Sequence, residues 1–200
     1  MLDAAFAWAY DPLLRGAEAA GLGAWRSRVL EGLSGEVLEV GAGTGLNLAH
    51  YPPDVRLTLL EPSAAMRKSL AARAGEHTVV AGRAEALPFE DGQFDAVVSG
   101  LVLCTVDDVT QALSELFRVL KPGGTFAFIE HVGGPERWRR VVQAGVEPVW
   151  RVLARGCRLT RDTEQAIAQA GFETVWLERA RLPGGAVVIH DAILGHVVRP

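Results

Sequence analysis

Hydrophobic and polar positions divide most of the chain into short apolar runs separated by amphipathic stretches. Short apolar runs bounded by glycine, proline or polar residues are typical of buried strands. Five such runs precede residue 133, and they cover residues 37–40, 56–61, 78–82, 94–100 and 125–132. Because amphipathic stretches lie between them, the alternation predicts a mostly parallel sheet with helices on both faces.

Helix signals occupy the intervening stretches. Apolar residues before Leu33 are helically spaced, and Ser63 is a suitable N-cap for a helix over residues 64–74, which Gly75 ends. The clearest helical face lies between residues 107 and 120, and "KPGG" closes that helix. Its apolar positions are Val109, Ala112, Leu113, Leu116 and Leu120.

The pattern changes after His131. Apolar residues recur every three or four positions from Trp138 to Leu153, which predicts a helix kinked at Pro148. A second helix is expected after it, then two strands joined by the turn "RLPGG" as a hairpin. These last three elements are expected over residues 161–171, 172–180 and 186–194.

Composition and charge limit the kind of protein. The chain has 200 residues, of which 49% are hydrophobic, and its net charge is -4. This is a folded chain of one-domain size without the basic surface that a nucleic-acid binder needs. With no internal repeat or linker, we expect a single α/β domain: a helical cap over 1–33, a core over 34–132, and further helices and strands over 133–200.

Cysteine usage and the N-terminal stretch bear on the compartment. Cys104 and Cys157 are the two cysteines of the chain, so no disulfide framework and no CxxC metal pair is expected. A reducing cytoplasm is the predicted compartment. The basic residues are nearly all arginine, which suggests GC-rich codons and a bacterial source. The first residues carry neither the basic start of a signal peptide nor the length of a membrane span.

The segment "VLEVGAGTGLNLAH" (residues 37–50) places glycines at 41, 43 and 45, directly after the first predicted strand. A dinucleotide site would need glycine at position 46, which is leucine, and a P-loop would need a following Lys-Ser/Thr pair. Glu61, twenty residues beyond Gly41, is placed to take ribose hydroxyls. The negative charge of Glu39 would repel a pyrophosphate and attract an ammonium group. S-adenosylmethionine fits these requirements better than NAD.

Successive motifs between residues 37 and 132 resemble those of class I S-adenosylmethionine-dependent methyltransferases. They are "VLEVGAGTG", "EPSAAM", "GRAEALPFEDGQFDAVVSG" and "LKPGGTFAFIEHV". The resemblance implies a Rossmann-like fold with a seven-stranded, mostly parallel sheet and a C-terminal antiparallel hairpin. It makes residues 34–132 the cofactor-binding core and 133–200 the acceptor side. It also implies S-adenosylmethionine as the cofactor and S-adenosylhomocysteine as the product.

The same resemblance assigns the cofactor contacts. The three glycines lie under the methionine part, Glu39 orients its amino group, and Glu61 binds the ribose. Pro62 and Met66 flank the adenine, and Ala84 lies at its edge. The remaining expected cofactor residues are Ala42, Thr44, Asn47, Arg83, Glu85, Ser99 and Leu101.

Arg83 departs from the family pattern, because many relatives carry there an aspartate that accepts a hydrogen bond from the adenine amino group. Arginine cannot accept. Backbone groups or Glu85 therefore take this role, or this edge of the adenine is recognised loosely. A rival interpretation of the whole motif set is a domain that binds the cofactor without catalysis.

The acceptor is expected over the ends of the fourth and fifth strands, along "SGLVLCTVDD" and "EHVGG". Because this wall is apolar, a small apolar acceptor is predicted, with Val102, Leu103 and Cys104 lining its pocket and no metal. Tyr10 is a candidate lid residue. Cys104 is otherwise interpreted as a small buried hydrophobe, and Cys157 as a structural residue without a partner.

The tail adds a second resemblance, to the methyltransferase-like type 7 family, through "LVLCTVDD", "FIEHV", "GCRLTRDTEQAIAQAGFE" and "RLPGG". Its animal members methylate alkyl thiols and sit on membranes, and this chain does not show their long apolar anchor. The resemblance implies a thiol acceptor. Phospholipid or quinone methylation is the alternative, because bacterial relatives are assigned to those reactions.

A thiol acceptor must lose its proton, since the thiolate is the nucleophile. His131, at the end of the fifth predicted strand, is the candidate base because its ordinary pKa lies near neutrality. A histidine that only shapes the pocket by hydrogen bonding is the equal alternative. The spacing of the other histidines does not suggest a metal site.

Residues 137–161 contain seven arginines and one acid, Glu147. A solvated polar helix face explains this composition. The other interpretation is a surface that contacts anionic lipid, with Trp138 and Trp150 at the interface. The predicted location is cytoplasmic, with peripheral membrane contact only under the second interpretation, and the oligomeric state is left open.

Overall fold

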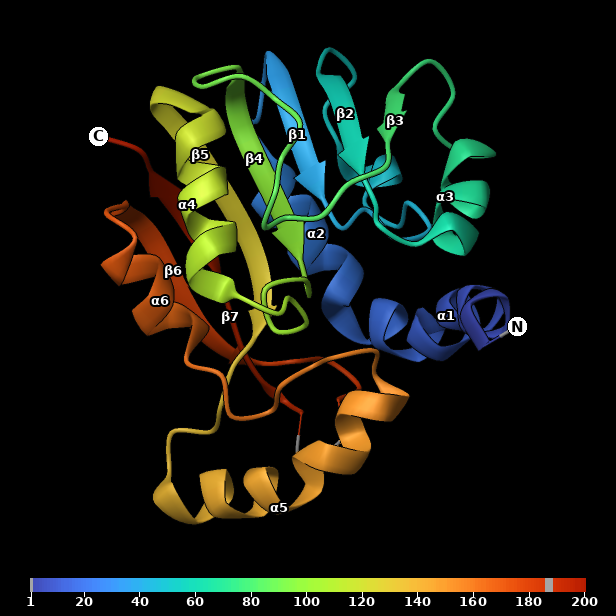
Figure 1. Ribbon diagram of the computed structural model, residues 1–200, viewed down its shortest axis with the longest axis vertical. Helices are drawn as coiled ribbons and strands as arrows, with labels where there is room; N and C mark the ends of the chain where they lie inside the picture. Colours follow the sequence, from blue (N-terminus) through green and yellow to red (C-terminus); the bar gives the residue numbers. More distant parts are fainter. Residues whose placement is uncertain (1, 186–188) are drawn as a thin grey trace.

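The computed structural model describes residues 2–185 and 189–200, which form one seven-stranded sheet in the order β3-β2-β1-β4-β5-β7-β6. β1 to β5 are parallel, and β7 runs antiparallel to both β5 and β6 (Figure 1). The predicted fold class is confirmed, including the C-terminal antiparallel hairpin. The strands are β1 (Glu36–Val40), β2 (Arg56–Leu60), β3 (Thr78–Val80), β4 (Phe94–Gly100), β5 (Leu120–His131), β6 (Glu173–Arg181) and β7 (Asp191–Val198).

Three helices, α3, α4 and α6, begin where the sequence supplies a capping side chain. Ser63 Oγ accepts from the Met66 N–H, as predicted, and the carboxylates of Asp108 and Asp162 cap α4 and α6 in the same way. The helices are α1 (Leu2–Ala17), the π-helical turn η1 (Glu18–Leu22), α2 (Gly23–Leu30), the 3₁₀ turn η2 (Leu48–His50), α3 (Ala64–Ala71), α4 (Val109–Val119), α5 (Arg137–Leu153) and α6 (Thr163–Gln169).

The sheet has an apolar layer on each face because successive side chains of a buried strand point to opposite sides. Leu38 and Val40 of β1 join the cluster under α4 and α6, whereas Val37 joins the cluster under α2 and α3. Figure 1 shows α4 and α6 on the near side of the sheet and α2 behind it. This confirms the prediction of helices on both faces.

The last strand differs from its prediction. The sequence placed it over residues 186–194, but β7 covers Asp191–Val198, and residues 186–188 lie outside the described residues. β7 pairs with β5 from Thr125↔Val198 to His131↔Ala192, so its position is fixed by a partner sixty or more residues away rather than by its own apolar run. Pairing also extends β5 back to Leu120, through the "KPGG" turn that closes α4.

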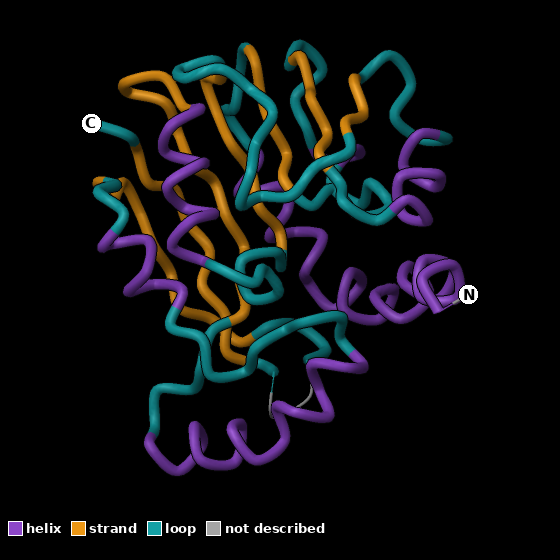
Figure 2. The backbone as a smooth tube through the Cα atoms, in the orientation of Figure 1, coloured by secondary structure: helices purple, strands orange, loops and turns teal. Residues whose placement is uncertain are grey.

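Two helices lie at the carboxyl ends of the parallel strands. Figures 1 and 2 show α1 at that edge on one side and α5 below it, away from the sheet. α5 continues through Pro148 and changes direction along its length in Figure 1, as the predicted kink requires. Within residues 2–185 and 189–200, no helix has both the length and the apolar character needed to cross a bilayer.

Candidate active site

The glycine loop after β1 uses its three glycines in two ways. A Cβ on Gly41 would lie 2.5 Å from Val102 Cγ2, and one on Gly45 would lie 2.7 Å from Leu48 Cδ1, so both positions are packed against side chains. A Cβ on Gly43 would meet nothing closer than Tyr10 Cε1 at 3.8 Å. Gly43, with its φ of 60°, is therefore the glycine at which the loop backbone stays accessible to a ligand.

Glu61 joins this loop to the end of β2. Its Oε2 accepts from the Gly43 N–H at 2.9 Å, and its Oε1 accepts from the Ser63 N–H at 2.8 Å. The side chain is buried, and burial raises the pKa of the carboxyl despite both hydrogen bonds. Glu61, the residue predicted to bind the ribose, is thus held in place by the backbone N–H groups of Gly43 and Ser63.

Glu39 ends a buried polar chain behind the loop. It accepts from Asn47 Nδ2 at 2.8 Å and from the Tyr51 hydroxyl at 2.9 Å. Asn47 Oδ1 accepts in turn from Arg26 Nη1 at 2.7 Å, and Arg26 pairs with Glu18 at 2.9 Å. Desolvation raises the pKa of Glu39 to about 7. Near neutrality this carboxyl is therefore poised to ionise when a cation arrives.

Hydrogen bonds and an ion pair join α1 to the glycine loop and to Arg73. Asp11 accepts from Thr44 Oγ1 at 2.5 Å and pairs with Arg73, which also donates to the Thr44 carbonyl at 3.1 Å. Tyr10, on the same helix, lies beside Gly43, and burial raises the pKa of its phenol to about 12. The predicted lid residue thus lies beside the cofactor loop, and its phenol is also near enough to Cys104 for the two groups to interact electrostatically.

The expected adenine side contains buried Met66 and Ala84 and exposed Pro62. Arg83 pairs with Glu85 at 3.1 Å and with Asp107 at 2.6 Å, and Glu85 Oε1 also accepts from the Asp107 N–H. The two acids explain how an arginine occupies this position, because they compensate its charge.

Glu130 is a buried acid that the sequence reasoning did not select. It accepts from Ser99 Oγ at 2.7 Å and from the backbone N–H groups of Val102 and Cys104. These bonds hold the loop after β4, in which Leu101 has a φ of 62°, a rare conformation for leucine. An acid inside the apolar run "FAFIEHV" was the available signal, just as Glu39 lies inside "VLEV".

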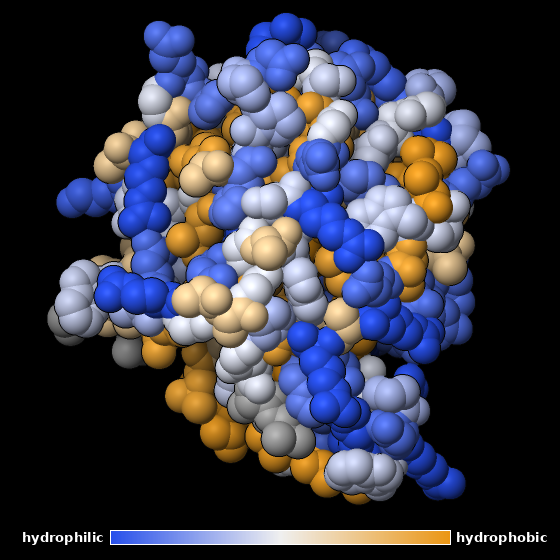
Figure 3. All heavy atoms as spheres, turned by 180° about the vertical axis from the view of Figure 1, so that it is seen from behind, coloured by the Kyte–Doolittle hydropathy of each residue, from blue (hydrophilic) through white to orange (hydrophobic). Residues whose placement is uncertain are grey.

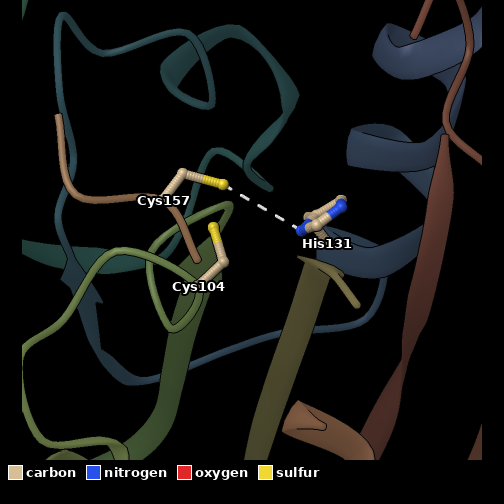
Figure 4. A group of neighbouring side chains, drawn as sticks. All are labelled: Cys104, His131 and Cys157. Atoms are coloured by element: carbon tan, nitrogen blue, oxygen red, sulfur yellow. Dashed lines mark hydrogen bonds between the residues drawn. The ribbon is translucent and has the colours of Figure 1, made fainter. Parts of the chain in front are cut away.

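The predicted acceptor residues separate in the structure. Val102 is half-buried beside Gly41, whereas Leu103 is fully buried in the core cluster under α4. Cys104 is buried and faces Cys157 and His131 (Figure 4). Of the three, Val102 is the residue with a partly open side chain.

Cys157 has partners, which corrects the prediction that it has none. Its Sγ lies 4.0 Å from His131 Nδ1, and the ligand atoms of Cys104, His131 and Cys157 all lie within 4.8 Å of one another. Hydrogen bonding from Cys104 and then from His131 lowers the pKa of Cys157, while the same pairing and burial raise the pKa of Cys104. Spacing missed this cluster because its members come from two separate loops and the end of β5, 26 or more residues apart.

His131 is buried at the end of β5, and its two ring nitrogens differ. Nδ1 faces Cys157, and the second nitrogen points away from both sulfur atoms in Figure 4. Nε2 is buried and has no hydrogen-bond partner among the described residues. The arrangement leaves one imidazole nitrogen available to exchange a proton with another molecule.

Comparison with known proteins supplies several relatives. A family model described as a methyltransferase domain matches residues 38–128. The human thiol S-methyltransferase TMT1A is 36% identical over 171 residues, which cover 82% of this chain and 70% of the relative. The human thiol S-methyltransferase TMT1B is 37% identical over 180 residues, which cover 85% and 74%. A demethylmenaquinone methyltransferase of Roseiflexus castenholzii is 42% identical over 184 residues, which cover 80% and 76%.

Solved structures share the fold at lower identity. A methyltransferase from Thermotoga maritima superposes with a TM-score of 0.72 at 22% identity and covers 98% of both chains. A geranyl diphosphate methyltransferase in complex with S-adenosylmethionine gives a TM-score of 0.68 at 15% identity, and covers 90% of this chain and 85% of that one. At these identities the similarity concerns the fold alone.

Proposed function

The chain belongs to the family of S-adenosylmethionine-dependent methyltransferases that includes the human thiol S-methyltransferases TMT1A and TMT1B, and we propose that its acceptor is a small apolar thiol. Family membership makes it an enzyme that uses S-adenosylmethionine, so the interpretation as a non-catalytic domain is set aside. The observation that supports a thiol acceptor is the buried imidazole of His131, with one nitrogen unpartnered among the described residues, beside the apolar loop after β4.

The residues of the glycine loop fit this cofactor. Gly43 leaves the backbone accessible, Glu61 offers a fixed carboxylate to ribose hydroxyls, and Glu39 offers a buried carboxyl to the ammonium group. When bound, S-adenosylmethionine supplies an electrophilic methyl group on a sulfonium and leaves as S-adenosylhomocysteine. The Asp11–Thr44 hydrogen bond and Tyr10 place α1 beside this loop, where it would shield a bound cofactor from water.

His131 prepares the acceptor in this proposal. The thiol proton would pass to Nε2, and the resulting thiolate would be positioned to accept the methyl group that bound S-adenosylmethionine supplies. Cys157 lies next to Nδ1, so a thiolate there stabilises the imidazolium that results. Since displacement at a methyl group depends mainly on alignment, positioning supplies much of the remaining catalysis.

A series of thiols of graded acidity tests the base role of His131. His131→Ala should lower the turnover of ordinary alkyl thiols by about a hundredfold or more, the usual contribution of a general base. The loss should shrink for acidic thiols, which arrive ionised, and at high pH for ordinary ones.

The structural alternative gives a different pattern. A histidine that only shapes the pocket predicts the same loss for every thiol, whatever its acidity. His77→Ala is the matched control, because His77 is exposed and distant in sequence from the proposed acceptor residues. A constant ratio of rates between wild type and His131→Ala across the series removes His131 from the base role.

A quinone acceptor is the second candidate, favoured by the 42% identity to a demethylmenaquinone methyltransferase. Demethylated quinols and phosphatidylethanolamine therefore belong in the same screen, with formation of S-adenosylhomocysteine as the common measurement. Turnover of a quinol that exceeds that of every thiol would replace the thiol by the quinone as the acceptor.

We further propose that α5 contacts anionic membranes from the protein's surface. Its exposed apolar side chains include Trp138, Val149, Val152 and Leu153, with exposed fractions of 64%, 64%, 78% and 65%. Figure 3 shows hydrophobic residues gathered at the base of the molecule, where α5 lies, beside long hydrophilic ones. Trp150 is not among them, which corrects its predicted place: it packs against the Cys104–Cys157 cluster.

Vesicle sedimentation tests this contact. Binding to acidic vesicles should appear at low salt and weaken as ionic strength rises, while neutral vesicles bind less. Arg137→Gln with Arg151→Gln should reduce it, because both side chains are exposed. Arg139 is unsuitable, since it pairs with Asp191 at 2.8 Å inside the fold.

Val149→Ser with Val152→Ser should also reduce vesicle binding, whereas Val175→Ser, an exposed apolar residue on β6, should leave it unchanged. Equal binding to neutral and acidic vesicles would reject contact between the arginines and anionic lipid, and the arginines would then form a solvated helix face. Concentration-dependent dimerisation that the α5 variants abolish would assign the face to a second copy of the chain instead.

A further inference from the structure

Three soft or borderline metal ligands meet in a buried space at the ends of β4 and β5. Cys104 follows β4, His131 ends β5, and Cys157 follows α5, and their exposed fractions are 2%, 3% and 8%. Figure 4 shows both sulfur atoms and one imidazole nitrogen turned toward a common point. The ligand atoms lie within 4.8 Å of one another, and Cys157 Sγ lies 4.0 Å from His131 Nδ1.

Backbone contacts hold these loops together before any ion is considered. The Arg158 N–H donates to the Cys104 carbonyl at 2.9 Å, which joins the two cysteine segments. Gly156 permits this approach, because a Cβ there would lie 2.9 Å from the Thr105 carbonyl oxygen. Glu130 fixes the Cys104 segment from the other side by accepting from its N–H. The ligands are therefore brought together by the fold itself.

Two thiolates and one imidazole are a ligand set that suits Zn²⁺. Tetrahedral zinc with bonds of about 2.3 Å to sulfur and 2.0–2.1 Å to nitrogen needs sulfur and nitrogen about 3.6 Å apart. The observed 4.0 Å between Cys157 Sγ and His131 Nδ1 requires only a small contraction. Three protein ligands also leave one coordination position for water or a further ligand, as in open zinc sites.

We propose that Cys104, His131 and Cys157 form a Zn²⁺-binding site whose occupation switches off the base of this methyltransferase. Zinc binding is inferred from the three ligands alone, whereas the regulatory effect of zinc rests on the proposed role of His131 as the base. Zn²⁺ takes the lone pair of Nδ1, the Cys157 thiolate binds the ion directly, and the thiol proton of Cys104 is released to solvent. The proton of the neutral imidazole is then confined to Nε2, so that nitrogen has no lone pair left for the acceptor's proton.

Cobalt substitution tests the binding part without any measurement of activity. The full chain is titrated with Co²⁺ in a phosphine reductant, which keeps both cysteines reduced. Wild type should develop sulfur-to-cobalt charge-transfer absorption that saturates at one equivalent, and Zn²⁺ should displace it. Proton release, followed with an indicator dye, should accompany the titration.

Single replacements identify the ligands. Cys104→Ser and Cys157→Ser should each remove part of the charge-transfer absorption, and His131→Gln should weaken binding while both sulfur ligands remain. Each replacement should lower the affinity for Co²⁺ by more than the roughly 10- to 100-fold that is lost when a residue that only hydrogen-bonds to a metal ligand is replaced. His77→Gln, which alters an exposed histidine, should bind Co²⁺ like wild type. Circular dichroism of each variant shows whether a loss reflects unfolding.

The regulatory effect is tested by measuring methyltransferase activity with and without Zn²⁺, at a buffered concentration of the free ion. Saturating Zn²⁺ should lower the turnover of ordinary thiols by about a hundredfold, the expected cost of losing the base, and a chelator should restore it. Cys104→Ser, compared with its own zinc-free rate, should lose this sensitivity.

The outcomes separate the two proposals. No charge-transfer absorption in wild type, or absorption unchanged in both cysteine variants, overturns the metal site whatever the activity shows. Cobalt binding with undiminished or increased turnover overturns the switch and keeps the site. Absence of thiol methylation in the chelated enzyme refutes the proposed acceptor, and cobalt absorption then still decides the metal site.

Discussion

The cofactor side and the acceptor side of this site are both organised by a buried acid within a strand, yet they are assembled over different sequence distances. Glu39 of β1 takes hydrogen bonds from Asn47 and Tyr51, eight and twelve residues away. Glu130 of β5 holds the loop that contains Cys104, and His131 meets Cys157 over 26 residues. One side is closed by its own loop, and the other by two loops and a strand end that the sheet brings together.

The two sides also differ in their chemistry. In the proposed placement, the cofactor side presents the carboxyl groups of Glu39 and Glu61 to a ligand that carries hydroxyls and a cation. The proposed acceptor side presents two cysteine sulfur atoms and an imidazole, where pairing lowers the pKa of Cys157 and raises that of Cys104. Changes on the first side should therefore alter cofactor affinity with every acceptor, while changes on the second should depend on the acceptor's acidity.

Gly43→Val should have the largest effect on the cofactor side. A side chain at this position occupies the surface where the loop backbone is accessible, so S-adenosylmethionine binding should fall by more than about a hundredfold, or more than about 2.7 kcal/mol. Calorimetry measures the loss. His131→Ala should in contrast keep the affinity of wild type.

Gly75→Val is the matched control for Gly43→Val. Gly75 has a φ of 58°, close to that of Gly43, and nothing lies within 4 Å of a Cβ placed on it. Both variants should lose about 1–2 kcal/mol of stability from the left-handed conformation. If both lose cofactor affinity equally, or neither does, the ligand does not lie on Gly43.

Glu39 should give the protein a measurable dependence of stability on pH. Because burial raises its pKa from 4.5 to about 7, the unfolded chain releases this proton before the folded one does. The contribution of the protonated form is complete below pH 4.5 and is lost as the pH rises to about 7. The loss should approach about 3 kcal/mol.

Denaturant unfolding at several pH values, compared between wild type and Glu39→Gln, isolates this effect. The variant should lack the decline between pH 4.5 and about 7, since an amide side chain cannot ionise. If ionised Glu39 holds the ammonium group, cofactor affinity of the wild type should also rise with pH up to about 7. Parallel stability curves for the two proteins would contradict a carboxyl that titrates near neutrality.

Glu61→Ala should have the smallest of these effects, a loss of about 1–3 kcal/mol in cofactor binding, the usual cost of leaving a hydrogen-bonding partner without its acceptor. The variant also releases the N–H groups of Gly43 and Ser63. Glu61→Gln keeps one acceptor oxygen and should lose less. Wild-type affinity in Glu61→Ala, measured by calorimetry, would place the ribose elsewhere.

Local elements were predictable where the signals lie close together. Ser63 caps α3 as expected because a cap bonds a backbone group three residues away. The end of the chain was less predictable, since β7 lies where β5 pairs with it and not on the nearest apolar run. Trp150 followed the same rule: its periodicity placed it on a helix, but contact with the Cys104–Cys157 cluster decided which way it faces.

The sequence by itself determined the alternating strands and helices, the glycine loop and the acids at positions 39 and 61, because each of these depends on interactions within about twenty residues. Only the tertiary structure decided that Cys157 meets His131 and Cys104, that Glu130 holds the loop after β4, and that α1 closes over Gly43. Those contacts depend on the order of strands in the sheet and on the closure of long loops. Neither is encoded in the spacing of residues along the chain.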